Sequence, residues 1–424
     1  MKMSGRSLVL GFMLAAVFGC SKLETLPQPY TTVRSDKQRV AVRLEDASRS
    51  QEWAQGQTQF SLNLFREIEK ASADGNLLIS PHSLTSALAM LYAGSTGDVE
   101  TAMAGALHFF QPQAEFHSTA NAIDSDIATR TQTSAGFTLQ IENAVWTDTH
   151  AKPLASFLDT LGENYGAGVN QTDFLGDPEG SRKAINEWVS DKTEGKILEL
   201  FGGGAIKKST VLALTNAVYL DAKWKNKFEA RDTAPAPFYL KSGTQISVST
   251  MSQSATFDYA EDETVQAVEL AYANEDFGFL IMLPKEGKES AFAEALSVEQ
   301  LGKITGSLQS IWTKVTLPKF EFSWNGVSTK EYLQALGMPV SGFSGILPPE
   351  YGPLDVESVS HKTWISVDEE GTKAAAATGI TMGVTSAGPS PDVIKVNRPF
   401  YFLIRDRKTS AILFLGHLMN PTEK

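Results

Sequence analysis

The sequence predicts an α+β fold built as one large domain. Apolar residues recur at helical spacing through the first half of the body, whereas apolar runs of strand type dominate the second half. We find no internal repeat and no linker after residue 55. The 424 residues are 42% hydrophobic and 20% charged, which is ordinary for a globular protein and argues against a fibrous or largely disordered chain.

The helical signals come first along the body. Apolar residues from 60 to 68 lie on one helical face, and the run at 77–79 has the length of a short buried strand. Ser80 and Pro81 predict the start of a second helix, with Ser as the cap and Pro at the first helical position. The apolar stripe that follows predicts a helix up to about Gly94.

Strand signals dominate the rest of the chain. Residues 182–200 still predict a helix, which should end by Gly195. Residues 211–220 form a nearly continuous apolar run, as expected of a strand buried on both faces. Two apolar runs around a polar turn at 399–418 are typical of a buried hairpin. Further strands are predicted at 137–141, 277–283 and 315–317.

The charge and the motif content of the sequence argue against several classes of function. The formal charge of −12 and the pI of about 5.1 argue against nucleic acid as the main partner. None of the six histidines pairs with another at metal-ligand spacing, and no GxSxG elbow is present. The glycines at 202–204 lack the GK[ST] continuation of a phosphate loop. We therefore expect no enzyme activity, no cofactor and no metal site.

The N-terminus resembles a bacterial lipoprotein signal. Two basic residues open it, residues 8–18 form an apolar core too short to span a membrane, and a Gly precedes Cys20. We expect residues 1–19 to be removed and Cys20 to be lipidated, with a plain secretory signal as the alternative. The protein would then be exported and anchored to a bacterial membrane, at the outer membrane or cell surface, or secreted if it is not lipidated.

Cys20 is the only cysteine, so no disulfide can form within the chain. Residues 20–55 are polar with scattered charges and little periodicity. They predict a tether that holds a globular domain, residues 56–424, away from the membrane.

The most informative stretch is residues 366–378, SVDEEGTKAAAAT. Carboxylates are followed by one Gly and by residues with almost no side chain, which can enter a crowded place. Gly371 supplies a pivot because it lacks a Cβ. The stretch predicts a hinge and a segment able to become a strand, with an Ala-rich linker or short helix as the alternative. The hinge residues are Glu369, Glu370, Gly371, Thr372, Ala374, Ala375, Ala376, Ala377 and Thr378.

Several separated segments resemble those of the serpin family, the serine-protease-inhibitor fold, and they occur in the same order. The resemblance covers about residues 55–421, with Ala271 standing where the family commonly has Pro. Besides the hinge EEGTKAAAAT, the matching segments are NLLISPHSLTSALAMLYAGSTGDVETAM, INEWVSDKTEGKILEL, TNAVYLDAKWKNKF, FDYAEDETVQAVELAYANEDFGFLIMLP and VNRPFYFLIRDRKTSAILFLGHLMNP.

The resemblance implies a large central mixed β-sheet of five strands, two further sheets, about nine helices and an exposed reactive-centre loop at about residues 369–392. It also implies a suicide mechanism. A target protease attacks a bait bond and forms an acyl-enzyme, and the cleaved loop then enters the central sheet as an extra strand. The expected partner is a serine protease, or also a cysteine protease, held covalently by a monomeric inhibitor.

The hinge residues make physical sense of this implied insertion. Alternate side chains of an inserted strand face the core, and this inward set is small: Thr372, Ala374, Ala376 and Thr378. Insertion of about ten residues adds roughly ten main-chain hydrogen bonds, on the order of 5–15 kcal/mol at about 0.5–1.5 kcal/mol each. The uncleaved state should therefore be metastable.

The resemblance also implies positions that control opening of the sheet. Glu369 and Lys319 match positions that pair at the top of the opening sheet, near Trp224. Ordinary structural hydrogen bonding is the alternative role for the second group, a polar cluster beneath the centre of the sheet. Its members are Ser80, Ser83, Asn216 and His361.

The bait bond follows from the family's spacing. Counting forward from Gly371 places it between Thr385 and Ser386, and Met382 and Val384 are alternative cut sites. Counting back from the C-terminal signature points a few residues later; we follow the forward count because insertion depends on the length from hinge to cut. Small bait residues fit a shallow pocket, so elastase-like or subtilisin-like proteases are the expected targets.

Two other hypotheses come from different classes. A serpin fold can serve binding or storage without inhibition, but such members tend to carry bulky or charged residues at the inward hinge positions, and this chain does not. An exported enzyme on an unrelated fold would need a catalytic constellation, which the sequence does not show. Inhibition is therefore the favoured interpretation.

Overall fold

The structure is a computed structural model that describes residues 29–43, 47–72, 75–325, 329–372 and 393–424. Within these residues the chain forms nine α-helices and two 3-10 turns, at Ala230–Asp232 and Pro349–Tyr351. The helices are α1 (Ala47–Ala71), α2 (Pro81–Tyr92), α3 (Gly97–Leu107), α4 (Gln113–Gln132), α5 (Ala155–Tyr165), α6 (Pro178–Lys192), α7 (Glu289–Ala295), α8 (Val298–Gly306) and α9 (Lys330–Ala335).

The described strands build two large sheets. The first half of the chain provides β1 (Thr31–Val33), β2 (Leu77–Ile79), β3 (Phe137–Asp148), β4 (Val169–Thr172) and β5 (Leu212–Lys223). The second half provides β6 (Ala234–Tyr239), β7 (Gln245–Glu261), β8 (Val265–Ala271), β9 (Phe277–Pro284), β10 (Gln309–Pro318), β11 (Phe320–Asn325), β12 (Ser358–Val367), β13 (Gly371–Thr372), β14 (Val393–Lys395), β15 (Phe400–Asp406) and β16 (Ile412–Leu418).

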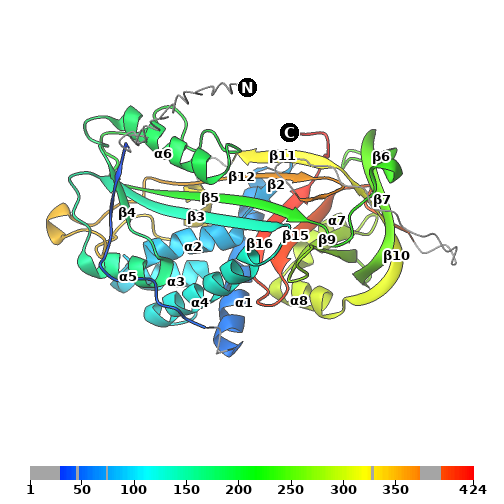
Figure 1. Cartoon of the computed structure of the whole chain (residues 1–424), viewed down its shortest axis with the longest axis horizontal. Coiled ribbons are helices and arrows are strands. Elements are labelled where there is room, and N and C mark those ends of the chain that lie inside the picture. The colour runs from blue at the N-terminus through cyan, green and yellow to red at the C-terminus, as the bar shows by residue number, and fades with distance from the viewer. Residues whose placement is uncertain (1–28, 44–46, 73–74, 326–328, 373–392) are drawn as a thin grey trace, which may run out of the picture.

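The central sheet has the order β1-β4-β3-β5-β13-β12-β11. Five of these strands form the mixed central sheet that the family resemblance implied: β4, β3, β5, β12 and β11. The short strand β1 extends it at one edge, and β13 lies between β5 and β12. Figure 1 shows β3, β5, β12 and β11 running lengthwise through the molecule, with α6 on one side and α2 on the other.

The other strands form one continuous sheet, β14-β10-β7-β8-β9-β15-β16-β2, with β6 paired to β7. The family resemblance implied two sheets here. The 17-residue strand β7 joins them, because it pairs with β10, β6 and β8 along its length. Every residue of β9 is buried, as its continuous apolar run predicts. All twelve residues of α2 are buried as well, because this helix contacts β3, β5 and β16.

Three local expectations need correction. Folded structure begins well before residue 55: β1 pairs with β4, and α1 starts at Ala47, so part of the predicted tether belongs to the body. Ser80 precedes α2, but its hydroxyl donates to the carbonyl of Leu413 and does not cap the helix. Helix α6 ends at Lys192, before the predicted stop at Gly195, because Glu194 already adopts a positive φ of 52°.

No helix among the described residues combines the length and the apolar character needed to cross a membrane. The described residues likewise hold no cluster of three or more histidine, cysteine or acidic side chains suited to a metal ion.

Candidate functional site at the hinge and the central sheet

The first residues of the hinge already lie inside the central sheet. Gly371 pairs with Lys223 of β5, and Thr372 pairs with Ala222 on one side and with Val367 of β12 on the other. Both pairings are antiparallel, so the chain turns back at the top of β12 and re-enters the sheet as β13. Two residues of an additional strand are therefore in place between β5 and β12.

Gly371 is required at this point by close approach of two backbones. A Cβ built on Gly371 would overlap the carbonyl oxygen of Ala222 and crowd the backbone of Lys223. Its φ is not among the positive values of the chain, so the expected need for an unusual backbone conformation is not the reason for glycine here. The hinge glycine lets β13 pack against β5.

Thr372 is the first inward-facing hinge residue, and it is only 2% exposed. Its hydroxyl lies 2.7 Å from the phenolic oxygen of Tyr272, which is itself fully buried. Burial raises the pKa of Tyr272, so the phenol stays neutral and can donate to or accept from the threonine. The small polar side chain of Thr372, which the sequence predicted to face inward, therefore lies in a buried site that contains a hydrogen-bonding partner, Tyr272.

A column of packed aromatic rings extends from the Tyr272 side chain that contacts Thr372. Tyr272 stacks on Trp224 with ring centroids 5.0 Å apart and meets Phe137 edge to face at 5.5 Å. Phe137 stacks in turn on Phe277 at 4.4 Å, and the guanidinium of Arg130 lies 5.0 Å from the centre of the Phe277 ring. The column runs from the hinge to helix α4 without a break.

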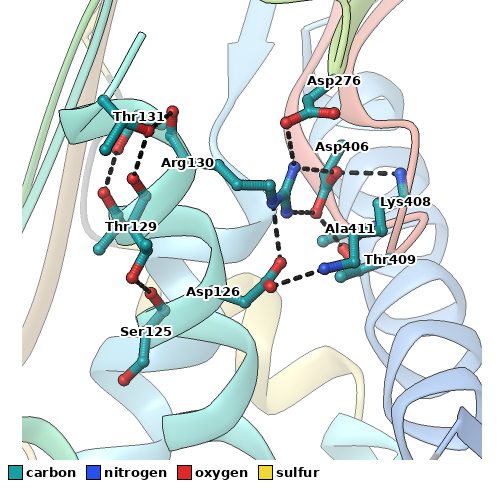
Figure 2. A network of polar contacts seen from close by, with 12 residues as sticks. Ser125, Asp126, Thr129, Arg130, Thr131, Asp276, Asp406, Lys408, Thr409 and Ala411 are labelled. Carbon is teal, nitrogen blue, oxygen red and sulfur yellow. Dashed lines mark hydrogen bonds and ion pairs between the residues drawn. The ribbon is translucent and has the colours of Figure 1, made fainter. Parts of the chain in front are cut away.

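Arg130 anchors the far end of the column in a charged network (Figure 2). Its guanidinium donates to both carboxylate oxygens of the fully buried Asp406, at 2.9 and 2.5 Å, and to Asp126 at 2.8 Å. Lys408 also reaches Asp126, at 2.7 Å. This network ties α4 to the end of β15 and the turn that follows it.

Charged and polar groups hold the turn that leads into the hinge. Glu369 accepts hydrogen bonds from Lys319 at 2.6 Å and from Thr233 at 2.8 Å. Partial burial alone would raise the pKa of Glu369, but these hydrogen bonds outweigh it and the pKa is lowered. The indole of Trp224 donates to the carbonyl of Asp368 at 2.9 Å. Glu369, Lys319 and Trp224 therefore do meet at the top of the sheet.

The second predicted group forms a fully buried cluster below the hinge. His361 Nδ1 lies 2.6 Å from Asn216 Oδ1, and His361 Nε2 accepts the backbone N–H of Ser80 at 3.0 Å. The Asn216 amide donates to the hydroxyl of Ser83 and, at 2.6 Å, to the side-chain oxygen of Asn143. Because Asn216 Oδ1 can only accept and the Ser80 N–H can only donate, the imidazole carries its proton on Nδ1.

The imidazole of His361 is held neutral. Burial lowers its pKa to about 3. A second proton would have to sit on Nε2, where it would face the N–H of Ser80 and break that hydrogen bond. Above that pH the cluster is therefore a set of neutral hydrogen bonds that joins β12, β5, β3 and α2.

The ladder between β5 and β12 is short. These strands pair directly from Ser358 with Ala213 to His361 with Asn216. Above this point, the described residues next join the two strands at Thr372, which lies between Ala222 and Val367. A small cavity directly below is lined by residues of both strands and of the second sheet: Leu220, Trp364, Ile365, Ser366, Thr372, Ile404 and Phe414. The direct pairing that ends at His361 and the bridge through Thr372 are thus the lower and upper ends of the stretch into which β13 would extend.

Some predicted residues lie outside the described part of the chain. These are the hinge residues after Thr372, namely Ala374, Ala375, Ala376, Ala377 and Thr378, the bait residues Met382, Val384, Thr385 and Ser386, and Cys20. Conversely, sequence reasoning missed Tyr272, Asn143 and Thr233. Asn143 takes the position where the alternation of Phe137, Leu139 and Ile141 calls for an apolar residue, which was a usable signal, whereas Tyr272 and Thr233 gave none.

These features define a protein whose central sheet holds the first residues of the hinge, Gly371 and Thr372, as a short strand between β5 and β12. Residues 55–421 match the family model Serpin (serine protease inhibitor). The chain therefore belongs to the serpin family, a family of protease inhibitors rather than enzymes.

Individual relatives agree with this assignment. The chain is 35% identical to the leukocyte elastase inhibitor of Bos taurus over 381 residues, which cover 86% of this chain and 98% of the relative. The solved structure of a thermophilic serpin, tengpin, in its native state matches with a TM-score of 0.80 and 26% identity, over 92% of this chain and 97% of that one. Thyroxine-binding globulin in complex with thyroxine matches with a TM-score of 0.77 and 28% identity, over 87% and 99%.

Proposed function

We propose that this serpin is a suicide inhibitor of serine proteases, with cysteine proteases as possible further targets. The observation that carries the proposal is the position of the first hinge residues within the central sheet. Gly371 and Thr372 already lie between β5 and β12, and the residues that would follow them inward are Ala374, Ala376 and Thr378, which are all small. An inhibitor that works by strand insertion needs such a hinge, whereas a carrier or storage protein does not.

The mechanism uses the protease's own chemistry. The catalytic hydroxyl attacks the carbonyl carbon of Thr385, the peptide bond to Ser386 breaks, and the new amino group of Ser386 takes up a proton as it leaves. Thr385 is then joined to the protease as an ester. The freed segment extends β13 downward between β5 and β12 and draws the ester-linked protease with it, before water can reach and hydrolyse the ester.

The proposed insertion requires the central sheet to open between β5 and β12. The inserting strand must separate β5 from β12, so it must break the bond between His361 Nδ1 and Asn216 Oδ1. The hydrogen bonds gained along the new strand, on the order of 5–15 kcal/mol in total, exceed this loss. Before cleavage the intact loop is fixed at both ends, which keeps the segment from inserting fully.

The proposed targets follow from the bait residues. Val384, Thr385 and Ser386 are small, which suits the shallow pockets of elastase-like and subtilisin-like enzymes. The relative named leukocyte elastase inhibitor supports this class. The working state proposed is a monomer that forms a one-to-one covalent complex.

We also propose that the protein acts from a membrane surface. Cleavage before Cys20 and lipidation of this residue would anchor an exported inhibitor at a bacterial outer membrane or cell surface. Metabolic labelling with a palmitate analogue tests this: label on the wild type but not on Cys20→Ser is expected, and an unlabelled wild type would leave a secreted protein.

The inhibitory mechanism is tested with residues 21–424. The protein is mixed with pancreatic elastase, subtilisin, chymotrypsin and trypsin, and the products are separated on a denaturing gel. A band at the summed mass that survives SDS is expected with elastase or subtilisin. Mass spectrometry of the released fragment should find a new N-terminus at Ser386. Clean cleavage without such a band would favour a non-inhibitory serpin used for binding or storage.

A further inference from the structure

An exposed tryptophan lies beside the point where the loop returns to the body. Trp312 on β10 is 62% exposed, while its neighbour Thr313 is buried. Along this strand the odd-numbered residues Thr313, Val315 and Leu317 face the core, so Trp312 and Lys314 face outward. Figure 1 shows β10 at the end of the molecule opposite α6.

The strands on both sides of β10 leave this indole uncovered. On β7 its partner is Thr256, a small exposed residue. On the other side, Lys314 pairs with Val393, the first described residue after the bait region, and the parallel pairing continues to Lys395. Val393 is 39% exposed and Lys395 is exposed. We call the outward group Trp312, Lys314, Val393 and Lys395 the Trp312 patch.

The Trp312 patch differs from the rest of this acidic protein. It combines two lysines with two exposed apolar side chains, whereas the whole chain has a formal charge of −12. The acidic side chain nearest along the sheet, Asp258 on β7, is already bound by Arg407 and by Ser310. Within the described residues we find no ring contact or ion pair made by the patch. A large exposed indole in such a setting is typical of a contact surface.

The length of the segment between the proposed bait bond and the Trp312 patch indicates which molecule contacts the patch. Ser386 and Val393 are seven residue steps apart, so the proposed bait bond lies within about 25 Å of the patch even when the segment is fully extended. A protease of about 250 residues has a radius of gyration of roughly 18 Å. Any protease held at the bait bond must therefore extend close to the patch, on the side where the chain leaves its active site.

We infer that the Trp312 patch is a second contact surface for the target protease. It fits an enzyme that presents an apolar side chain beside its cleft, and the two lysines favour neighbouring carboxylates. The inference rests on the proposed function, because a protease must first engage the loop. Contacts outside the bait residues would strengthen the encounter complex and select among proteases that accept the same bait sequence.

The test uses Trp312→Thr in residues 21–424, with pancreatic elastase and subtilisin as probes. Thr suits an exposed strand position, so the melting temperature should not change. We expect the second-order rate constant of inhibition to fall about tenfold for the enzyme that uses the patch, in the range of a contact hot spot. The number of inhibitor molecules consumed per protease should stay the same. Val393→Thr should lower the rate constant to a smaller extent.

The matched control is Leu198→Thr, which removes another exposed apolar side chain (72% exposed) in the connection after α6. It should leave the rate constant unchanged. An unchanged rate constant in Trp312→Thr with both enzymes would overturn the inference. A change in sedimentation behaviour on mutation would overturn it as well, since the occupant would then be a second copy of the chain.

This result is separable from that of the proposed function. If the protein forms no covalent complex and is only cleaved, kcat/KM for loop cleavage still reports the encounter. A tenfold lower kcat/KM in Trp312→Thr would then support the contact surface while suicide inhibition fails.

Discussion

His361 and Asn216 are joined twice across the same pair of strands. Their backbones form the uppermost direct pair of the parallel ladder between β12 and β5, and their side chains meet at 2.6 Å. Insertion of the hinge strand must separate these two strands. Under the proposed mechanism, the pair would therefore act as a latch at the lower boundary of the stretch that opens.

Removing this latch should favour spontaneous insertion. His361→Ala leaves the Asn216 oxygen and the Ser80 N–H without their partner inside the sheet, at a cost of about 1–3 kcal/mol for each buried group. We expect the purified variant to lose inhibitory activity faster than the wild type at 37–50 °C, as uncleaved inserted monomer or as polymers, and Asn216→Ala to behave alike.

Activity and native gels sampled over time measure this loss. His117→Ala is the matched control, because His117 is also buried but bonds Tyr165, away from β5 and β12. It should lower stability without speeding the conversion. Equal rates of activity loss in His361→Ala and wild type would contradict the latch.

A charge at the inward hinge position should turn the inhibitor into a substrate. Thr372 is already buried in the sheet against Tyr272, so an Arg in its place would bury an unpaired guanidinium whenever β13 occupies the sheet. For Thr372→Arg we expect normal cleavage of the loop and loss of at least nine-tenths of the SDS-stable complex. Thr372→Ser keeps the hydroxyl and should still form the complex; an undiminished complex in the Arg variant would contradict the role of the hinge.

The ion pair at the top of the sheet should control how often the hinge leaves it. Lys319 is 37% exposed and Glu369 is 15% exposed, so the pair contributes about 1 kcal/mol at most. In Lys319→Met the amides of residues 370–372 should exchange hydrogen up to about fivefold faster, as measured by mass spectrometry. Lys303→Met removes an exposed pair on α8 and should not change this exchange. Unaltered hinge exchange in Lys319→Met would show that the pair does not hold the hinge.

The buried histidine predicts a pH dependence of stability. Burial lowers the pKa of His361 to about 3, against about 6.5 in an unfolded chain. As the pH falls below about 6.5, the unfolded state binds a proton that the folded state does not, so the free energy of unfolding decreases. His117, with its pKa lowered to about 4, acts in the same direction.

Urea unfolding between pH 7 and pH 4.5 measures this dependence. His361→Asn should make the slope smaller without abolishing it, because His117 remains. A slope that is the same in wild type and His361→Asn would contradict a neutral buried imidazole.

Much of the fold was accessible from the sequence because the large elements carry strong periodic signals. The runs that became β5, β9 and the β15–β16 hairpin were predicted at nearly their observed bounds. The short strand β1 was not predicted. Its three residues, Thr-Thr-Val, are too few to show a periodic pattern, and they form a strand because they pair with β4. Short elements of this kind depend on tertiary contacts that a local pattern does not contain.

The site divides in the same way. The pairing of Glu369 with Lys319, and the meeting of His361 with Asn216, followed from family motifs. Tyr272 and its hydrogen bond to Thr372 could not be predicted, because residues 100 positions apart come together only through the packing of two sheets. The reason for Gly371 was also beyond the sequence, since the close approach of Ala222 is visible only in three dimensions.

The central claim is that the loop enters the sheet after it is cut, and a comparison of melting temperatures tests it most directly. Residues 21–424 are cleaved in the loop with a trace of thermolysin, a metalloprotease that forms no acyl-enzyme and so cannot be trapped, and the intact and cleaved forms are heated side by side. Roughly ten new strand hydrogen bonds predict a rise of about 5–20 °C on cleavage. The Thr372→Arg variant, cleaved in the same way, should gain much less. A cleaved wild-type protein that melts at or below the temperature of the intact form would contradict the account.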